Sequence, residues 1–334
     1  MRLGLSFDLK DDIKPGEAVA EDALEEYDSR ETVSLLADCL QAGGHQVTLL
    51  GGGRQFIENA LSNKVDFVFN IAEGRGSHRS REAQVPCILE MLGIPYSGSD
   101  PLCLAVCLDK PLAKKLVALE GVHTPGWQLV SSVKEATDVN WGDFTFPVII
   151  KPAHEGSSKG IRLTSVAEDA SQAKAEIKRI IGGYLQPVII EEFIGGDEVT
   201  IGVIGNSPAQ VLGMMHIIPR KNNGRFVYSL EVKRDYKNLV DYECPAQLPD
   251  AVLQKIRAAS LKVFQTLGCR DFARIDFRLD ADGTPYFIEI NPLPGLGTHS
   301  DLVIMALKLG WTHQRLVNAI LAAAVERQPQ CAAV

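Results

Sequence analysis

The sequence has little of what marks an exported, membrane-bound or nucleic-acid-binding protein. It contains no uncharged run of about 18 residues, the length that indicates a membrane-spanning helix. The start, MRLGLSFDLKDD, lacks the cationic flank and long apolar core of a secretory signal peptide. The formal net charge of −8 leaves no broad basic field for DNA, RNA or an anionic membrane. We therefore expect a cytoplasmic protein with neither nucleic-acid nor membrane partners.

Cysteine is present, but not in a pattern that indicates a bonded framework. The seven cysteines stand at positions 39, 87, 103, 107, 244, 269 and 331, with no Cys-x-x-Cys pair among them. An odd and scattered set of this kind favours neither a disulfide framework nor a zinc site. The cysteine pattern therefore predicts a reducing compartment such as the cytosol.

What the sequence does have is the pattern of a folded protein with several domains. Of its 334 residues, 46% are hydrophobic, and the length allows about two or three domains. The segment RLGLSF reads as a strand, and apolar positions at Val33, Leu36, Ala37 and Leu40 follow a helical period. The apolar segments QVTLL and VDFVFNI then read as strands, and VDFVFNI is continuous enough for a buried parallel strand. This order predicts an α/β domain over 1–121.

The pattern changes in the rest of the chain, where hairpins replace the strand–helix alternation. The segments PVIIKP, GIRLTS, PVIIEEFI and EVTIGVIG predict strands of a smaller α+β domain over 122–205. The segments AQVLGMM, FVYSLEVK, FARIDFRLD and TPYFIEIN predict strands of a third domain over 206–334. An amphipathic helix over 251–267 and a closing helix over 301–326 complete this domain.

Two of these strands carry charge on one face. In ARIDFRLD, Arg274 and Asp276 alternate with apolar residues, and the next strand places Glu289 and Asn291 on one face. If the strands pair, Asp276, Glu289 and Asn291 converge. Two carboxylates and an amide oxygen suit Mg²⁺. The alternative is a solvated polar face on an edge hairpin.

A loop of small residues lies between two of the expected strands. In VIIKPAHEGSSKGIRL, the loop Glu155–Gly160 follows Lys151, so its N–H groups and this lysine suit phosphate oxygens. Gly156–Gly160 also match the Gly-x-Ser-x-Gly elbow of hydrolases, but that motif requires a helix next, whereas IRLTS alternates as a strand. The glycines at 51–53 lack the third glycine of the dinucleotide fingerprint, which argues against a Rossmann site.

Several ordered segments together resemble the ATP-grasp superfamily, and more narrowly D-alanine–D-alanine ligase and its relatives. They are LEMLGIPYSGSDPLCLAVCLDK, VIIKPAHEGSSKGI, VIIEEFIGGDEVTIGVIG, ARIDF and FIEINPLPGLGTHSD. The resemblance spans nearly the whole chain. It implies an ATP-grasp fold with three domains: an N-terminal parallel α/β domain, a small central α+β domain and a C-terminal α+β domain with an antiparallel sheet. The activity that it implies is ATP-dependent joining of two D-alanines for peptidoglycan biosynthesis.

The resemblance also implies the roles of individual residues. The expected ATP contacts are Lys110, Lys151, Glu155, Gly156, Ser157, Ser158, Glu191, Glu192, Phe193, Ile194, Glu198 and Lys233. Within this set, Glu155–Gly160 would form a lid with Ser157 at its tip, Glu191–Ile194 would hold adenine, and Glu198 the ribose. Two Mg²⁺ ions, with Mn²⁺ as an alternative, would bind Asp276, Glu289 and Asn291. Ser157 and Lys233 would also act in catalysis, and Arg274 and the N–H of Gly295 would bind the oxyanion.

The amino-acid substrates would contact a second set of residues, in which the sequence departs from the family. That set is Glu31, Arg274, Gly295, Ser300 and Asp301. In SRETVS, Glu31 and Ser34 stand one residue further apart than in the family's Glu-x-Ser motif, and Glu73 replaces a histidine. Arg234 follows Lys233 where a tyrosine is common, and Asp301 stands where the family has an apolar residue.

These departures leave several interpretations open. Asp301 is either a helix N-cap or a contact for a polar or cationic acceptor, and Arg234 is either a surface lid residue or a partner for an acidic substrate. Ligation of a different amino acid or small carboxylate is therefore an alternative function, and a nucleotide-binding protein without turnover is a third. A homodimer is expected from the resemblance alone.

Overall fold

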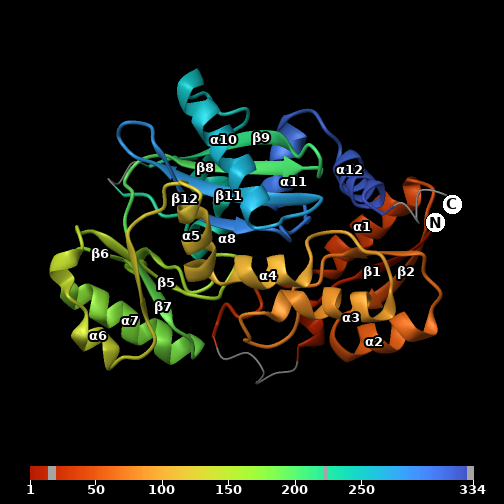
Figure 1. Cartoon of the computed structure of the whole chain (residues 1–334), viewed down its shortest axis with the longest axis horizontal. Helices are drawn as coiled ribbons and strands as arrows, with labels where there is room; N and C mark the ends of the chain where they lie inside the picture. The colour runs from red at the N-terminus through yellow and green to blue at the C-terminus, as the bar shows by residue number, and fades with distance from the viewer. Residues whose placement is uncertain (14–19, 222–224, 329–334) are drawn as a thin grey trace.

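The computed structural model describes residues 1–13, 20–221 and 225–328, and arranges them around three sheets (Figure 1). The N-terminal sheet has the order β2-β1-β3 and is parallel throughout. Its elements are β1 (Arg2–Ser6), α1 (Arg30–Ala42), β2 (Gln46–Gly51), α2 (Gly53–Ser62), β3 (Phe67–Asn70), α3 (Gln84–Leu92), α4 (Pro101–Leu108) and α5 (Lys110–Leu119), with single 3₁₀ turns η1 (Lys10–Asp12) and η2 (Arg81–Ala83). Every residue of β3 is buried, as its continuous hydrophobicity predicts.

The second sheet is small and antiparallel, with the order β4-β7-β5-β6. Its elements are β4 (Trp127–Val130), α6 (Glu135–Asp138), η3 (Trp141–Asp143), β5 (Val148–Pro152), η4 (Leu163–Ser165), β6 (Val166–Ala167), α7 (Ala170–Tyr184) and β7 (Val188–Glu192). Helix α7 packs its apolar face, including Ile177 and Ile180, against the buried side chains of this sheet.

The third sheet is larger, with the order β10-β9-β8-β11-β12, and is antiparallel. Its elements are β8 (Glu198–Ile204), β9 (Gln210–Pro219), α8 (Leu230–Arg234), α9 (Tyr236–Leu239), β10 (Val240–Glu243), α10 (Asp250–Thr266), β11 (Phe272–Leu279), β12 (Pro285–Asn291), α11 (Asp301–Lys308) and α12 (His313–Glu326). The predicted ATP-grasp architecture, with one parallel and two antiparallel sheets, is thus present.

Some expected elements differ in the structure. Strand β8, which the boundary at residue 205 assigns to the central domain, pairs with β9 and β11 in the third sheet. The segment GIRLTS is not a strand but a turn that leads into η4, and FVYSLEVK ends in the short helix α8. The expected helix over 301–326 is two helices, because the chain turns at Gly310, whose φ of 79° is left-handed. No helix of the described residues is long and apolar enough to cross a bilayer.

The first and last parts of the chain share one core. Helix α12 lies along α1 (Figure 1), and Leu316 and Ile320 are fully buried in the same cluster as Leu36 and Leu40. Helix α12 therefore completes the hydrophobic core that α1 shares with the N-terminal sheet.

A buried ionic network joins the N-terminal and central parts. Arg81, in η2, has no exposed side-chain surface, and its Nη2 lies 2.7 Å from Glu26 and 3.1 Å from Glu155. Its Nη1 donates to the carbonyl of His154 at 3.0 Å, and Lys159 contacts the same two carboxylates. Burial is tolerated here because each charge has a partner of opposite sign.

This network predicts a large cost for removing its central cation. We expect Arg81→Ala to lower the free energy of unfolding by about 3 kcal/mol or more, because it leaves Glu26 and Glu155 with too little compensating charge. The matched control is Arg54→Ala, whose side chain is 92% exposed and lies 4.0 Å from Glu58, and which should change stability by less than about 0.5 kcal/mol. Urea unfolding followed by circular dichroism measures both, and equal midpoints for the two variants would show that the network is not stabilising.

Candidate functional site

Two adjoining cavities are lined by the predicted site residues: the first lies between the second and third sheets, and the second lies between the third sheet and the N-terminal part of the chain. The first, of about 70 Å³, is lined by the predicted residues Lys151, Ser158, Glu191, Glu192, Phe193, Ile194, Glu198, Lys233, Asp276 and Glu289. The second, of about 320 Å³, is lined by the predicted residues Ser157, Lys233, Arg274, Asn291, Gly295, Ser300 and Asp301. Lys233 and Tyr228 line both cavities. The structure therefore separates the expected ATP residues from most of the expected substrate residues but keeps the two groups in contact.

Buried lysines share one carboxylate at the floor of the first cavity. Lys151, on β5, lies 2.7 Å from Glu191 on β7, and Lys114 of α5 lies 3.2 Å from the other oxygen of this carboxylate. Burial lowers the pKa of Lys114 to about 8, although the charge of Glu191 opposes this shift. The side chain of Glu191 is therefore turned toward lysines and leaves only its backbone for the expected adenine contact.

Arg278 organises the opposite wall of the first cavity. Its Nη1 donates to Glu198 at 2.8 Å, its Nε donates to the carbonyl of Ile194 at 2.5 Å, and its guanidinium lies 4.7 Å from the centre of the Phe193 ring. Burial raises the pKa of Glu198 to about 7, although Arg278 opposes the shift. The wall expected to hold adenine and ribose is thus preorganised by one arginine.

The loop expected to act as a lid closes the first cavity. Ser157 and Ser158 both have left-handed backbone conformations, with φ of 51° and 57°. The hydroxyl of Ser158 donates to the carbonyl of Tyr228 at 3.0 Å, and the carbonyl of Glu155 accepts a hydrogen bond from Lys110. Contacts at both ends therefore hold the loop in an otherwise unfavourable conformation.

The expected metal ligands meet across two paired strands. The antiparallel register of β11 and β12 places Asp276 directly opposite Glu289, and Arg274 opposite Asn291. Asp276 accepts hydrogen bonds from Thr200 at 2.7 Å and Arg274 at 2.9 Å, and Glu289 lies 3.2 Å from Lys110. Burial would raise the pKa of Glu289, but the neighbouring cations, Lys110 above all, lower it to about 2. The polar face thus points into the cavities, which excludes the alternative of a solvated edge hairpin.

The second cavity brings the expected oxyanion and acceptor residues together. A Cβ atom added to Gly295 would lie 3.1 Å from the hydroxyl of Ser300, so this backbone and side chain are neighbours. Arg274, on the adjacent β11, is 9% exposed. An N–H group, a hydroxyl and a guanidinium converging on one cavity can bind a carboxylate or stabilise an oxyanion.

Asp301 does not cap helix α11. The N-cap position is Ser300, and Asp301 is the first helical residue. The carboxylate of Asp301 instead accepts a hydrogen bond from Tyr228 at 3.0 Å and lies 3.6 Å from Nη1 of Arg274. The N-cap interpretation of this residue was therefore wrong.

Glu31 is not part of the cavity. Helix α1 begins after Ser29, whose hydroxyl accepts the N–H of Thr32 at 3.1 Å, and this start leaves Glu31 exposed. The lining residues from this segment are Asp28, Ser29 and Thr32 instead. The expected substrate contact of Glu31 is thus not supported. The N-cap at Ser29 fixes where the helix begins, and the first turn then places Glu31 on the exposed side.

Two carboxylates without partners line the N-terminal wall of the second cavity. Within the described part of the chain, neither Asp28 nor Glu73 makes a side-chain hydrogen bond or ion pair. Burial, followed by the charge of Asp8, raises the pKa of Asp28 to about 7. Burial and then Glu82 raise the pKa of Glu73 well above its usual range. This wall therefore places two carboxyl groups, whose protonated forms are favoured by burial, where they can donate or accept hydrogen bonds.

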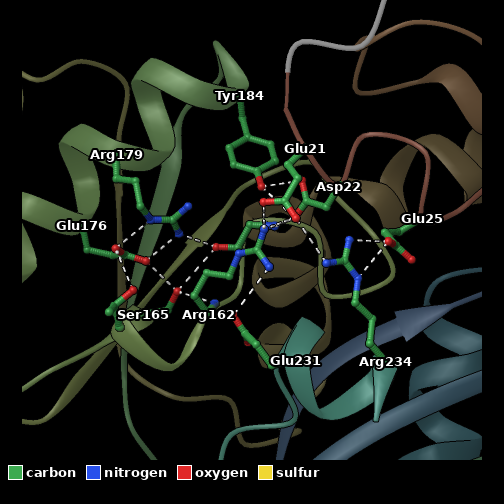
Figure 2. Close-up of polar contacts among 12 residues, drawn as sticks. Glu21, Asp22, Glu25, Arg162, Ser165, Glu176, Arg179, Tyr184, Glu231 and Arg234 are labelled. Carbon is green, nitrogen blue, oxygen red and sulfur yellow. Dashed lines mark hydrogen bonds and ion pairs between the residues drawn. The ribbon is translucent and has the colours of Figure 1, made fainter. Parts of the chain in front are cut away.

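Arg234 lines the second cavity and contacts carboxylates of the N-terminal segment (Figure 2). Its Nη2 lies 2.5 Å from Glu25 and its Nη1 lies 3.3 Å from Glu21. Figure 2 also shows Asp22 between Arg162, at 3.6 Å, and the hydroxyl of Tyr184, at 2.6 Å. We call these six residues the clasp. Arg234 thus belongs to the segment around α8 (Leu230–Arg234), which we call the flap, and because it also lines the second cavity both of its interpretations stay open.

Three cysteines that are scattered in the sequence meet in the core. Cys103 and Cys107, one turn apart on α4, have sulfur atoms 3.8 Å apart, and the sulfur of Cys269 lies 3.6 Å from that of Cys103. All three lie within 4.8 Å of one another, which is close enough for one metal ion. The spacing in the sequence did not predict this cluster, because Cys269 comes from a distant segment.

Comparisons with known proteins agree with this geometry. A family model described as D-ala D-ala ligase C-terminus matches residues 116–322. A protein named D-alanine–D-alanine ligase from Aquifex aeolicus is 32% identical over 294 residues, covering 88% of this chain and 94% of that protein. The chain belongs to the D-alanine–D-alanine ligase family. It is therefore an ATP-dependent ligase of ATP-grasp fold.

Further relatives extend the comparison. The uncharacterised protein y4sG from Sinorhizobium fredii is 34% identical over 297 residues, covering 86% of this chain and 85% of that protein. The crystal structure of D-alanine–D-alanine ligase from Bacillus anthracis complexed with ATP superposes with a TM-score of 0.74 at 23% identity, covering 99% of both chains. The latter supports the fold of this D-alanine–D-alanine ligase family member over nearly its full length.

The sequence analysis did not assign several residues of the site, among them Arg278, Lys114, Tyr228 and Asp28. Lys114 stands four positions after Lys110 and so shares its face of helix α5, which is a signal that the sequence contained. Tyr228 lies in a segment that was taken for a strand, and Asp28 lies in an irregular segment without periodicity. For these two residues, only the assembled structure shows the contacts.

The raised pKa of Asp28 predicts that part of the stability of the protein depends on pH, and that Asp28→Asn removes this part. Its pKa is raised from 3.8 to about 7 in the folded protein, so the folded state binds more protons than the unfolded state between these values. Its contribution to stability is therefore lost as the pH rises through about 7. Asp28→Asn should melt at a higher temperature than the wild type at pH 8, with a smaller difference at pH 5. Exposed Asp38 gives the control, Asp38→Asn, and a gain at pH 5 equal to that at pH 8 would contradict the assignment.

Proposed function

We propose that this ligase joins two D-alanine molecules into D-alanyl-D-alanine through an acyl phosphate. The observation that carries the proposal is the pairing of β11 with β12, which places Arg274 and Asp276 against Asn291 and Glu289 at the junction of the two cavities. The relatives named D-alanine–D-alanine ligase support the choice of substrate.

The carboxylates and amide at this junction fit a divalent metal. Glu289 has a lowered pKa and is ionised at neutral pH, and it stands opposite Asp276. The amide oxygen of Asn291 accepts one hydrogen bond, from the N–H of Leu293 at 2.9 Å, so it retains a second lone pair. Oxygen ligands of this kind suit Mg²⁺, which would neutralise phosphate charge when bound. Mg²⁺ or Mn²⁺ as the ion, and a homodimer as the assembly, remain predictions.

The residues of the first cavity support the phosphorylation step. The carboxylate of the first D-alanine attacks the γ-phosphorus of ATP, and ADP leaves, which gives an acyl phosphate. Lys151 and Lys233 have side chains at the cavity wall and would place positive charge against the transferring phosphoryl group. The loop Glu155–Gly160, whose Ser158 lines this cavity, would exclude water that hydrolyses the acyl phosphate.

The residues of the second cavity support the bond-forming step. The amino group of the second D-alanine attacks the acyl carbon, and the carbonyl oxygen becomes an oxyanion. Arg274 and the N–H of Gly295 would donate hydrogen bonds to that oxygen, and one such donor is worth about 100- to 1000-fold in rate. The intermediate then collapses with loss of inorganic phosphate, and the amine loses a proton. Ser300 lines the same cavity and would hold the carboxylate of the second D-alanine.

A panel of substrates tests this function. Purified protein with Mg-ATP is given D- and L-amino acids singly and in pairs, ADP release is measured, and the products are identified by mass spectrometry. We expect ADP release with D-alanine alone, together with one dipeptide formed for each ADP. Turnover only with another pair of amino acids would contradict D-alanine as the substrate while keeping the ligase chemistry.

A second candidate is ligation of an amino acid other than D-alanine. The unpartnered carboxylates of Asp28 and Glu73, and the replacement of an apolar residue by Asp301, favour a substrate with an additional cationic or hydrogen-bonding group. In the same panel, a preference for amino acids with a second amino group would support this candidate.

The metal assignment predicts the effect of one conservative substitution. Glu289→Gln removes a charged ligand but keeps the shape of the side chain, so we expect loss of Mg²⁺-dependent ADP release with a circular dichroism spectrum like that of the wild type. The matched control is Glu58→Gln, whose side chain is 69% exposed on α2 and should not affect turnover. Unchanged phosphate release in Glu289→Gln would defeat the assignment.

A further inference from the structure

Tyr228 lies where the two cavities meet, and its carbonyl, ring and hydroxyl each contact a different element. Its carbonyl accepts the hydroxyl of Ser158 in the lid loop at 3.0 Å. Its ring makes a cation–π contact with Lys233, whose Nζ lies 5.1 Å from the ring centre. Its hydroxyl donates to Asp301 at 3.0 Å and lies 2.5 Å from the hydroxyl of Tyr242. Lid, flap and acceptor end therefore meet at this residue.

Asp301 links Tyr228 to Arg274, because its carboxylate contacts both side chains. Asp301 is 6% exposed, so its charge requires partners, and Tyr228 and Nη1 of Arg274 are the groups that supply them. The remaining side of the guanidinium, Nε and Nη2, is held by Asp276. Carboxylates on opposite edges therefore fix the plane of the guanidinium.

The two carboxylates around Arg274 differ in their expected second role. Asp276 is a proposed metal ligand, whereas Asp301, on α11, stands beside Ser300 at the acceptor end of the second cavity. If a bound metal drew on Asp276 and on Glu289, whose carboxylate lies 3.9 Å from Nη2 of Arg274, Asp301 would remain as a partner of the guanidinium. An apolar residue at this position, as the family commonly has, would leave both Arg274 and the hydroxyl of Tyr228 with one contact fewer.

We propose that Tyr228 and Asp301 form a positioning pair that couples closure of the lid loop over ATP to the orientation of Arg274 at the acceptor end. The proposal rests on the proposed function for the identity of the acceptor. Neither residue transfers a proton or touches a reacting atom. The pair acts by holding Arg274 where the oxyanion develops, and it does so only when Ser158 and Tyr228 are in contact.

Kinetics of conservative variants test the pair. Tyr228→Phe keeps the ring under Lys233 but removes the hydroxyl, and Asp301→Asn keeps the shape but removes the charge. Each should lower kcat/KM for the second D-alanine about 10- to 100-fold, which is the effect of losing a hydrogen bond to a charged group, while the KM for ATP changes less than about threefold. The double variant should be no worse than the poorer single variant, because the residues act as one unit.

The matched control is a tyrosine–carboxylate hydrogen bond elsewhere in the chain. Tyr96, beyond β3, donates to Glu90 at 2.8 Å and lines neither cavity. Tyr96→Phe should leave all kinetic constants within about twofold of the wild type. Single variants at 228 and 301 that match this control, or effects that multiply in the double variant, would overturn the proposal.

Hydrogen exchange separates this proposal from the proposed function. With Mg²⁺ and a non-hydrolysable ATP analogue, amides of the loop 155–160 should exchange at least about threefold faster in Tyr228→Phe and Asp301→Asn than in the wild type. If the wild type does not join D-alanine, the proposed function fails, but this measurement still decides the pair. Unchanged exchange in a folded Asp301→Asn variant would overturn the coupling, even if Tyr228→Phe did not fold.

Discussion

The register between β11 and β12 is the constraint on which the site depends. A shift of one residue between the strands would put Asp276 and Glu289 on opposite faces of the sheet, with one of them in the core. Ile275 and Ile290, paired directly between them, are 0% and 5% exposed, so burial favours one register strongly. The positions of the oxygen and nitrogen atoms that we propose to act in catalysis are therefore fixed by the apolar residues that alternate with them, and the neighbouring cations then balance the buried charge.

Local patterns predicted much of the fold and of the first cavity. Lys151, Glu191, Asp276 and Glu289 lie on strands whose alternation shows which side chains share a face. The incorrect predictions concern contacts between segments that are distant in the sequence. Strand β8 belongs to the third sheet because β11 pairs with it, and the sequence contains no local signal of that partner. Tyr228, Cys103, Cys107 and Cys269 gain their neighbours only by tertiary packing. The N-cap of α1 sets where that helix begins, and this start leaves Glu31 exposed instead of in the cavity.

The departures from the family cluster on the wall of the second cavity and on the flap. The first cavity keeps cations and carboxylates at the positions that the family resemblance implies, whereas the carboxyl groups of Asp28, Glu73 and Asp301 line the second cavity. Arg234 lines the second cavity as well, where it is paired with Glu21 and Glu25 of the clasp. The departures from the family therefore lie in the part of the molecule where we expect the amino acids to bind.

The contact between α1 and α12 has a consequence for folding. The core that contains Leu36 and Leu40 of α1 is completed by Leu316 and Ile320 of α12, which are far from α1 in the sequence. Contacts between such distant segments cost chain entropy before they stabilise the protein, so we expect this core to form late in folding. A substitution that loosens α12 should therefore expose the apolar face of α1 as well.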